Sequence, residues 1–363
     1  MVGHVTAPTS ESENRDYTRE SCEVHARPLT IAVDVLGGDH APTVVCDGVS
    51  AFVTQEPDCN ILLTGPADVV ESLALRHPGR ICAHPTTEFI GMDEHPATAV
   101  KTKKDSSIVV ACRLVKDGHA DAFFSAGSTG ACMAAATLVI GRIKKVARPA
   151  IAAVIPAPEN PVVLLDVGAN ADVKPEYLLQ FAQMGRAYAA AVLGVPEPRI
   201  GLLNIGSEPS KGSMLAQEAF SLLSANMAGF AGNAEGNDLF TGAFDCIVTD
   251  GFTGNVVLKT TEGTASALFK LMKAALTSSI SAKVGAGLVK NKLAALKDTM
   301  SAEKYGGAPL LGLKNVVIIG HGSSNARAIT NGIRATADAV RAHLPQRIEA
   351  TIAFDTVSET EAL

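Results

Sequence analysis

Six short loops that combine glycine with small polar residues are the part of this sequence best suited to chemistry. Glycine lets backbone N–H groups approach a ligand closely. Where such a loop opens a helix, the unpaired N–H groups and the helix dipole favour an anion. The six loops therefore indicate an anionic ligand that carries phosphate. They are GGDHAP (37–42), SAGSTG (125–130), DVGAN (166–170), NIGSEPSKG (204–212), TDGFTGN (249–255) and GHGSSN (320–325).

The glycines and polar side chains of these loops form the predicted binding site. One such loop alone is ordinary turn chemistry, so the prediction depends on all six meeting at one edge of a sheet. Neither a Walker GxxxxGK(S/T) loop nor a GxGxxG fingerprint after the first strand is present, which argues against the common nucleotide sites. The residues expected to bind substrate or phosphate are Gly37, Gly38, Ser125, Gly127, Ser128, Thr129, Asn170, Asn204, Gly206, Ser207, Thr253, Gly254, His321, Ser323 and Ser324.

The sequence gives no support for a covalent acyl-enzyme. There is no GxSxG nucleophile elbow. Cys132 and Cys246 fall in helix and strand patterns, where buried structural thiols are typical. Direct attack by a bound nucleophile requires less, namely positioning and donors aimed at the developing oxyanion.

Buried strands are predicted to position the loops. Apolar runs such as LTIAVDVL (29–36), VVLLDV (162–167) and VVII (316–319) alternate with helical segments. Such runs are typical of strands buried on both faces of a mostly parallel sheet. We therefore expect an α/β fold, a three-layer α/β/α sandwich, with one unit over residues 29–348. No repeat is apparent in the sequence.

Three segments are expected to lie outside the sheet. Residues 1–28 are polar and lack the apolar region of a signal peptide, so we expect a disordered leader. Residues 349–363 are expected to form a flexible tail. The stretch from about 262 to 304 contains no convincing strand and predicts a protruding pair of helices, Thr264–Leu276 and Ser281–Lys297.

Composition excludes several classes of protein. Apolar residues make up 47% of the chain, so a core is easily formed. The net charge of -6 argues against a nucleic-acid binder, which needs a basic surface. The seven cysteines contain no CxxC pair, so we expect no zinc site. We also expect no other metal and no cofactor. No run approaches the roughly 18 apolar residues that a membrane-spanning helix needs.

Nine motifs in the same order resemble the phosphate acyltransferases of bacterial phospholipid synthesis, the PlsX family. The match runs from about Thr30 to Leu344. The resemblance implies that a long-chain acyl group moves from an acyl-carrier-protein thioester to inorganic phosphate, giving acyl phosphate. It also implies a fold similar to phosphotransacetylases and isopropylmalate dehydrogenase. The motifs are IAVDVLGGDHAP, SAGSTGA, GRIKKVARPAIA, LLDVGANADVKPEYLLQFA, GLLNIGSEPSKG, GNAEGNDLF, TDGFTGNVVLKTTEG, YGGAPLLGLKN and HGSSNARA.

The resemblance also implies where the protein works and with what. Family members are homodimers in the cytoplasm that associate peripherally with the inner face of the cell membrane. There a glycerol-3-phosphate acyltransferase consumes the acyl phosphate. Two other functions suit an anion-binding α/β chain: a short-chain phosphotransacetylase that uses coenzyme A thioesters, and a non-catalytic sensor of a phosphate ligand. Comparing carrier-protein-bound palmitoyl with acetyl-coenzyme A as donors separates the two enzymes.

Four residues carry the chemistry that the resemblance implies. Lys211, in NIGSEPSKG, is expected to hold phosphate or polarise the thioester carbonyl, and the alternative is a solvated lysine. Asn255, which closes TDGFTGN, is expected to donate to the oxyanion, and the alternative is a turn or cap. Asp39 and His40 could protonate the leaving thiolate, and a capping Asp beside a structural His is an equal alternative.

Two basic runs and one helix are candidate contact surfaces. The carrier protein is acidic as a class and this chain is negative overall, so attraction between them must be local. Ordinary solvated faces are the competing interpretation. The helix Ser281–Lys297 mixes lysines with apolar residues, which is typical of a helix on a bilayer surface. For Thr264–Leu276, packing across a dimer is the stronger alternative. The basic runs are Lys101, Lys103 and Lys104, and Arg142, Lys144, Lys145 and Arg148.

Overall fold

The computed structural model describes residues 28–299 and 302–360, and its eleven strands form one sheet. Across the sheet the order is β3-β2-β1-β4-β11-β10-β5-β6-β9-β7-β8. The strands are β1 (Leu29–Asp34), β2 (Cys59–Gly65), β3 (Ile81–Pro85), β4 (Ala122–Ser125), β5 (Ala150–Ile155), β6 (Val162–Leu165), β7 (Ile200–Leu203), β8 (Phe230–Ala234), β9 (Cys246–Val248), β10 (Ala308–Leu311) and β11 (Val316–Ile319).

The sheet contains two runs of parallel strands that point in opposite directions. Strands β3, β2, β1, β4 and β11 are parallel to one another, and so are β6, β9, β7 and β8. Between the runs, β11 with β10, β10 with β5 and β5 with β6 all pair antiparallel. These successive reversals leave the two runs opposed. The mostly parallel α/β sheet is confirmed, but the expectation that all six loops share one sheet edge is wrong.

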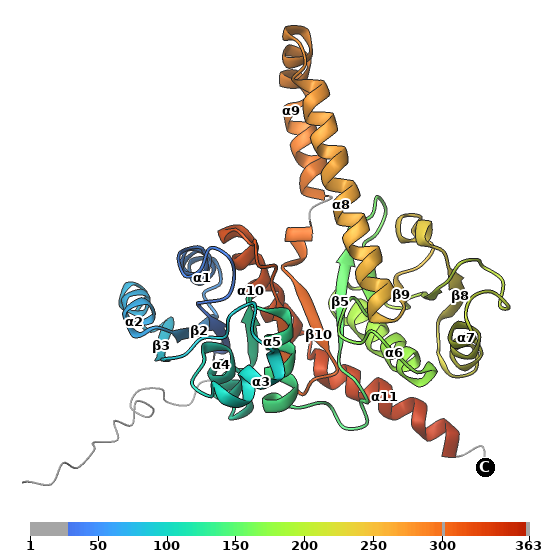
Figure 1. Cartoon of the computed structure of the whole chain (residues 1–363), viewed down its shortest axis with the longest axis horizontal. Coiled ribbons are helices and arrows are strands. Elements are labelled where there is room, and N and C mark those ends of the chain that lie inside the picture. Colours follow the sequence, from blue (N-terminus) through green and yellow to red (C-terminus); the bar gives the residue numbers. More distant parts are fainter. Residues whose placement is uncertain (1–27, 300–301, 361–363) are drawn as a thin grey trace, which may run out of the picture.

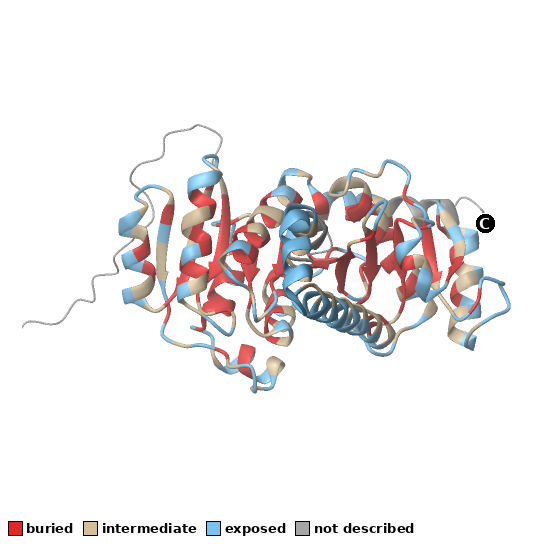
Figure 2. Ribbon diagram, turned by 90° about the horizontal axis from the view of Figure 1, so that it is seen from above, coloured by how far each residue is buried: buried red, intermediate tan, exposed pale blue. Residues whose placement is uncertain are grey.

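Helices cover both faces of the sheet, which makes three layers (Figure 1). Along β1, Ile31 and Val33 belong to one buried apolar cluster and Ala32 to the other, because successive side chains of a strand point to opposite faces. Helices α1, α2, α6, α7, α10 and α11 pack on the first face, and α3, α4 and α5 on the second. Figure 2 shows the buried residues concentrated in the sheet and on the inner sides of these helices.

The helices are α1 (Thr43–Gln55), α2 (Ala67–Arg76), α3 (Pro96–Thr102), α4 (Ser107–Lys116), α5 (Thr129–Ala135), α6 (Pro175–Ala191), α7 (Met214–Asn226), α8 (Gly251–Leu276), α9 (Ile280–Thr299), α10 (Ala326–Arg341) and α11 (Leu344–Thr360). A π-helix (Ala136–Ile140) continues α5. Two short 3-10 helices (Gly236–Phe240 and Ala302–Tyr305) complete the described helices.

Helices α8 and α9 form the protruding pair expected from the sequence, and they extend well beyond the rest of the molecule (Figure 1). The first helix begins at Gly251, inside the loop TDGFTGN, rather than near Thr264. Large apolar side chains lie in solvent along the pair: Leu268 is 64% exposed and Leu288 is 85% exposed. A long helix that starts in a predicted binding loop therefore carries an uncovered apolar surface away from the sheet.

The segment expected to be a flexible tail is helical where the structure describes it. Helix α11 runs to Thr360, and Ile348 and Ile352 are buried in the core cluster. They pack beside α6, so the sheet unit continues past residue 348. The leader expected over 1–28 lies outside the described residues except for Pro28, and so does the end of the tail, 361–363.

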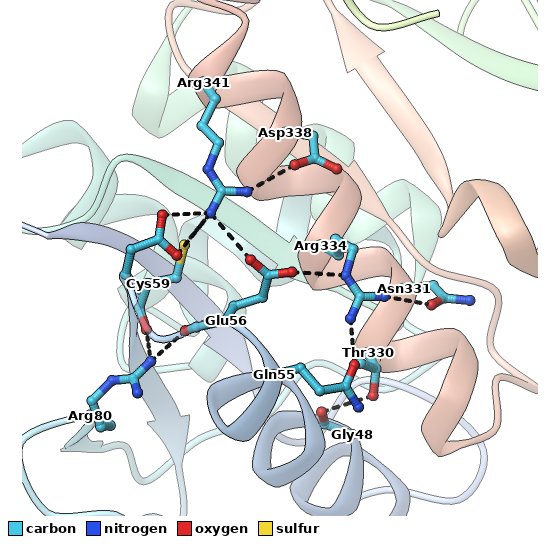
Figure 3. Close-up of polar contacts among 11 residues, drawn as sticks. Gly48, Gln55, Glu56, Cys59, Arg80, Thr330, Asn331, Arg334, Asp338 and Arg341 are labelled. Atoms are coloured by element: carbon cyan, nitrogen blue, oxygen red, sulfur yellow. Dashed lines mark hydrogen bonds and ion pairs between the residues drawn. The ribbon is translucent and has the colours of Figure 1, made fainter.

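Ion pairs fasten α10 to the connection between α1 and β2 (Figure 3). Arg334 Nε lies 3.1 Å from Glu56 Oε1, and Arg341 Nη2 lies 2.9 Å from Asp58 Oδ2. Arg80 donates from Nη2 to the backbone carbonyl oxygen of Glu56 at 2.6 Å. The two arginines of α10 thus join that helix to the connection between α1 and β2, and Arg80 holds the same connection from its other side in sequence.

Candidate functional site

The topology divides the six loops into two groups, one after each parallel run. The first loop group follows β1, β4 and β11 and consists of residues 37–42, 125–130 and 320–325. The second loop group follows β6, β7 and β9 and consists of residues 166–170, 204–212 and 249–255. Of the four residues expected to carry chemistry, Lys211 and Asn255 belong to the second group, and Asp39 and His40 belong to the first.

A buried carboxylate, that of Asp166, organises the second loop group. It directly follows β6 and is 0% exposed. Its Oδ1 accepts backbone N–H groups of Ile151, Gly168 and Ala169 at 3.0, 3.2 and 3.0 Å. Its Oδ2 accepts both the backbone and the side-chain amide of Asn170, at 2.7 and 2.9 Å. Burial raises the pKa of Asp166, and the hydrogen bonds from the loop oppose that shift. Asn170, predicted to bind substrate, is thus engaged within the protein.

Helix α8 starts next to this carboxylate. Asp250 caps it: Oδ1 accepts the backbone N–H of Thr253 at 2.8 Å and Oδ2 accepts the Thr253 hydroxyl at 2.7 Å. A Cβ on Gly254 would collide with the backbone carbonyl oxygen of Asp166, so only glycine fits there. Asn255 follows and is exposed, and among the described residues its side-chain amide makes no hydrogen bond. Its N–H groups are therefore free to donate to a ligand.

Polar side chains also hold the loop that carries Lys211. Asn204 Nδ2 donates to the carbonyl oxygen of Lys211 at 3.1 Å, and Asn233 Nδ2, on β8, donates to the carbonyl oxygen of Glu208 at 2.9 Å. Gly212 has φ +89°, and a Cβ there would collide with Asn204 Oδ1. The Lys211 side chain is exposed and takes part in none of the ion pairs within the described ranges. The loop thus presents a free ammonium group on a fixed backbone.

The sequence does not single out two polar residues that hold the second loop group in place. Asp166 was read only as part of a loop, although an acid directly after the apolar run VVLL is the signal for a buried carboxylate. Asn233 is 6% exposed, and its Oδ1 is one of the buried polar atoms without a hydrogen-bond partner in the described chain. Its place in the motif GNAEGNDLF, at the end of a strand, was the available signal.

A second buried carboxylate, that of Asp34, organises the first loop group. It ends β1 and is 2% exposed. Its Oδ2 accepts the Ser125 hydroxyl at 2.8 Å, and its Oδ1 accepts the backbone N–H of Leu36 at 3.0 Å. Burial raises the pKa of Asp34. Ser125, predicted to contact a ligand, is fully buried and engaged with Asp34. Gly37 packs so closely on this loop that a Cβ would lie 2.7 Å from the Gly127 nitrogen.

The remaining predicted residues of the first loop group line its surface. Asp39 is joined to the loop after β11, because its backbone N–H donates to Gly322 at 2.8 Å. His321 Nδ1 lies 2.8 Å from the Ser323 hydroxyl and accepts the Ser323 backbone N–H at 3.2 Å. Ser128 caps α5 by accepting the Ala131 N–H. Among the predicted residues, those that are exposed are Asp39, His40, Thr129, His321 and Ser323 here, and Ser207, Lys211 and Asn255 in the second group.

The cysteines within the described ranges are unsuited to nucleophilic attack at neutral pH, with the exposed Cys82 as the exception. Cys132 and Cys246 are fully buried, as the sequence predicts. Burial raises the pKa of the Cys132 thiol to about 12 and also raises that of Cys246. The reactive form of cysteine is the thiolate, so these thiols stay unreactive. In the described part of the chain, no group of three or more His, Cys, Asp or Glu residues could hold a metal ion.

Comparison with known proteins gives close relatives along nearly the whole sequence. A family model described as "Fatty acid synthesis protein" matches residues 29–347. A phosphate acyltransferase of Desulfitobacterium hafniense is 49% identical over 324 residues, 88% of this chain and 97% of that protein. A phosphate acyltransferase of Bacillus pumilus is 44% identical over 333 residues, 92% of this chain and 100% of that protein.

Solved structures with this fold are more distant in sequence. A phosphotransacetylase from Streptococcus pyogenes is 16% identical with a TM-score of 0.58, covering 86% of this chain and 94% of that one. A branched-chain phosphotransacylase from Enterococcus faecalis is 14% identical with a TM-score of 0.53, covering 86% and 99%. These similarities concern the fold alone, and they confirm the expected phosphotransacetylase-type architecture.

Proposed function

The chain belongs to the phosphate acyltransferase family of fatty acid and phospholipid synthesis, and we propose that it takes a long-chain acyl group from an acyl-carrier-protein thioester. The transfer of an acyl group to phosphate follows from its relatives, which are phosphate acyltransferases at 44% to 49% identity over most of the chain. The identity of the donor, the chain length and the residues that act are the proposed part.

In the proposed reaction, an oxygen of bound phosphate attacks the thioester carbonyl carbon directly. The carbon–sulfur bond breaks, the acyl phosphate leaves, and the carrier-protein thiolate takes up a proton. The ammonium group of Lys211 balances phosphate charge, and the amide of Asn255 donates to the oxyanion that develops on the carbonyl oxygen. One observation carries this proposal: the two side chains are exposed and unpaired on loops that follow the adjacent strands β7 and β9.

The loops of the first group are proposed to complete the cleft. Neighbouring strands rotate by about 20–25°, so β1 and β9, six places apart in the order, differ by about 120–150°. Opposite edges of such a sheet can face the same side of the molecule. In that geometry Asp39 and His40 reach the leaving thiolate as proton donors, and the first-group glycines and hydroxyls add contacts to the substrate.

The experiment that tests the proposal is a comparison of donors. Purified protein is incubated with phosphate and either palmitoyl-carrier protein or acetyl-coenzyme A, and acyl phosphate is trapped with hydroxylamine. We expect the hydroxamate from the carrier-protein donor, and none when Lys211→Ala replaces the natural protein. Turnover of acetyl-coenzyme A alone would instead make the chain a short-chain phosphotransacetylase.

We also propose peripheral association with the inner face of the cell membrane, delivery of acyl phosphate to a glycerol-3-phosphate acyltransferase there, and a homodimer. No described helix has the length and apolar character needed to cross a bilayer. The support is the α8–α9 pair, on which Ile280 and Leu288 are 83% and 85% exposed beside several lysines. Apolar side chains flanked by lysines suit an anionic bilayer surface. Packing of α8 against a second copy would cover Leu268 and Leu271 instead.

A further inference from the structure

A cavity of about 420 Å³ lies on the second face of the sheet, between α3, α4 and the π-helix that follows α5. Four of its lining residues are basic, and they come from α3, from the connection between α3 and α4, and from α4 rather than from one run of sequence. Apolar side chains of α4 and the π-helix form part of its wall. The residues used below are Lys101, Lys104, Arg113, Lys116, Val109 and Leu138. We call this cavity the basic groove.

The positive charges of the basic groove are not balanced by the protein itself. Between described residues, none of the ion pairs involves these four basic side chains, and Asp117 is the one acid in the lining. The whole chain has a net charge of -6. A concentration of unpaired positive charge on an acidic protein attracts an anionic partner locally.

The structure also changes which lysines of the sequence run 101–104 are available. Lys103 turns away from the groove: its Nζ lies 2.7 Å from Glu94 Oε1 and donates to the carbonyl oxygen of Phe89 at 3.0 Å. Lys101 and Lys104 line the groove instead, with Arg113 and Lys116 of α4. The charged surface is therefore formed by α3, α4 and the connection between them, and the linear run predicted it only in part.

The lining of the groove suits an amphipathic partner. Val109, Arg113 and Lys116 are spaced i, i+4 and i+7 along α4, so they share one face. Leu138, 55% exposed, faces solvent in the same lining. An apolar centre with a charged rim is the general arrangement of a protein interface. An acidic amphipathic helix would cover Leu138 and place carboxylates against the basic side chains.

We propose that the acidic carrier protein docks on the basic groove through such a helix. The proposal rests on the proposed function, which supplies a carrier protein as the donor. Helix α3, whose Lys101 lines the groove, begins at the first loop group, because a Cβ on Gly130 of that group would lie 2.7 Å from Pro96, the first residue of α3. None of the groove residues belongs to the reaction machinery proposed above.

The test is a double charge reversal, Lys101→Glu with Arg113→Glu, compared with Lys144→Glu and Arg148→Glu from the other basic run, where both side chains are also exposed. Steady-state kinetics use acyl-carrier protein and, in parallel, the same acyl group on a small pantetheine thioester. We expect the groove variant to raise KM for the carrier protein by about tenfold or more. Its kinetics with the small thioester and all kinetics of the matched control should stay unchanged.

Binding of holo-carrier protein, measured by calorimetry, separates this proposal from the proposed function. If binding is lost in the groove variant but kept in the control variant, docking at the groove is supported. This conclusion holds even if the natural protein does not turn over the acylated carrier protein. Unchanged KM and unchanged binding in the groove variant would overturn docking at the groove. Equal losses with the small thioester would also overturn it, since they would show damage to the reaction site.

Discussion

The two loop groups follow one local plan and differ in what they add to it. In each, a strand leads into a buried aspartate, Asp34 after β1 and Asp166 after β6. In each, the neighbouring parallel strand leads into a GxTG loop that opens a helix: 127–130 opens α5 and 251–254 opens α8. The similarity is local and did not stand out as a repeat in the sequence.

The differences lie in the hydrogen bonds and in the exposed residues. Asp166 accepts five N–H groups, four of its own loop and one of β5, whereas Asp34 accepts one N–H and the side-chain hydroxyls of Ser125 and Ser107. Helix α5 has 7 residues and α8 has 26. The second loop group also presents Lys211 and Asn255. The same backbone plan thus supports two different groups. The second loop group is tightly fixed and presents an unpaired cation and amide, whereas the first loop group presents histidines.

The largest expected effect would show which of the two loop groups contributes more to kcat. We expect Lys211→Ala and Asn255→Ala each to lower kcat by about a hundredfold or more, because an oxyanion donor or its equivalent is lost. His40→Ala should cost about tenfold, because Asp39 beside it can still protonate the leaving thiolate, and His321→Ala, which has no proposed proton transfer, should cost less. Rates come from steady-state assays, with circular dichroism to verify folding. A loss in His40→Ala no larger than that in His321→Ala would contradict the proposed proton donation from the first loop group.

The next effect compares the two buried aspartates by the free energy of unfolding. In Asp166→Asn, a side-chain NH2 group would face at least two N–H donors, and unmet buried donors cost about 1–3 kcal/mol each. In Asp34→Asn, the NH2 group can donate to the Ser125 oxygen, so we expect a change within about 1 kcal/mol. Urea denaturation measures both. Equal destabilisation of the two variants would contradict the difference drawn between the loop groups.

A smaller effect concerns Asn233, which holds the Lys211 loop through Glu208. Asn233→Leu should lower kcat by about tenfold, since misplacing a substrate-positioning group by a fraction of an ångström reduces catalysis. The unfolding free energy should hardly fall, because the substitution also removes a buried oxygen that has no partner. Both kcat, from steady-state kinetics, and the free energy of unfolding, from urea denaturation, are measured on the same protein sample. A normal kcat would show that the loop keeps its shape without Asn233.

The smallest effect concerns the α8–α9 pair, which extends from the second loop group and has no counterpart at the first. Replacing Val284 and Leu288 at the far end of the helical pair with serine removes apolar area that has no contact with the sheet. We expect several-fold weaker binding to anionic liposomes in a flotation assay, since interfacial binding scales with buried apolar area. Turnover in solution should not change. If sedimentation instead shows dissociation of a dimer, these side chains serve a subunit interface.

The sequence predicted where the strands lie along the chain better than it predicted the direction in which each strand runs in the sheet. The bounds of β11, 316–319, agree with the expected run, because a continuous apolar segment marks a buried strand. The same pattern carries no sign of strand direction, so the reversals at β10 and β5 could not be foreseen, and the loops were placed at one edge.

The site was predicted in the same uneven way. Lys211 and Asn255 were found because they stand in distinctive loops. The pattern includes Asp34 and Asp166 in the apolar runs 29–36 and 162–167 and so does not mark them as site residues, and only the folded structure shows how many donors enclose each carboxylate. Lys103 was counted as a docking charge, but Glu94, nine residues earlier, neutralises it.

The pairing of β4 with β11 has a consequence for synthesis of the chain. Residues 122–125 hydrogen-bond to residues 316–319, so the first parallel run lacks its last strand until most of the chain has been made. At about 5–20 residues per second, the interval is about 10–40 s. During it, β4 presents an open edge, which is prone to wrong pairing. The N-terminal part of the sheet is therefore complete only after residues 316–319 have left the ribosome. Arg334 and Arg341 of α10 then form ion pairs with Glu56 and Asp58.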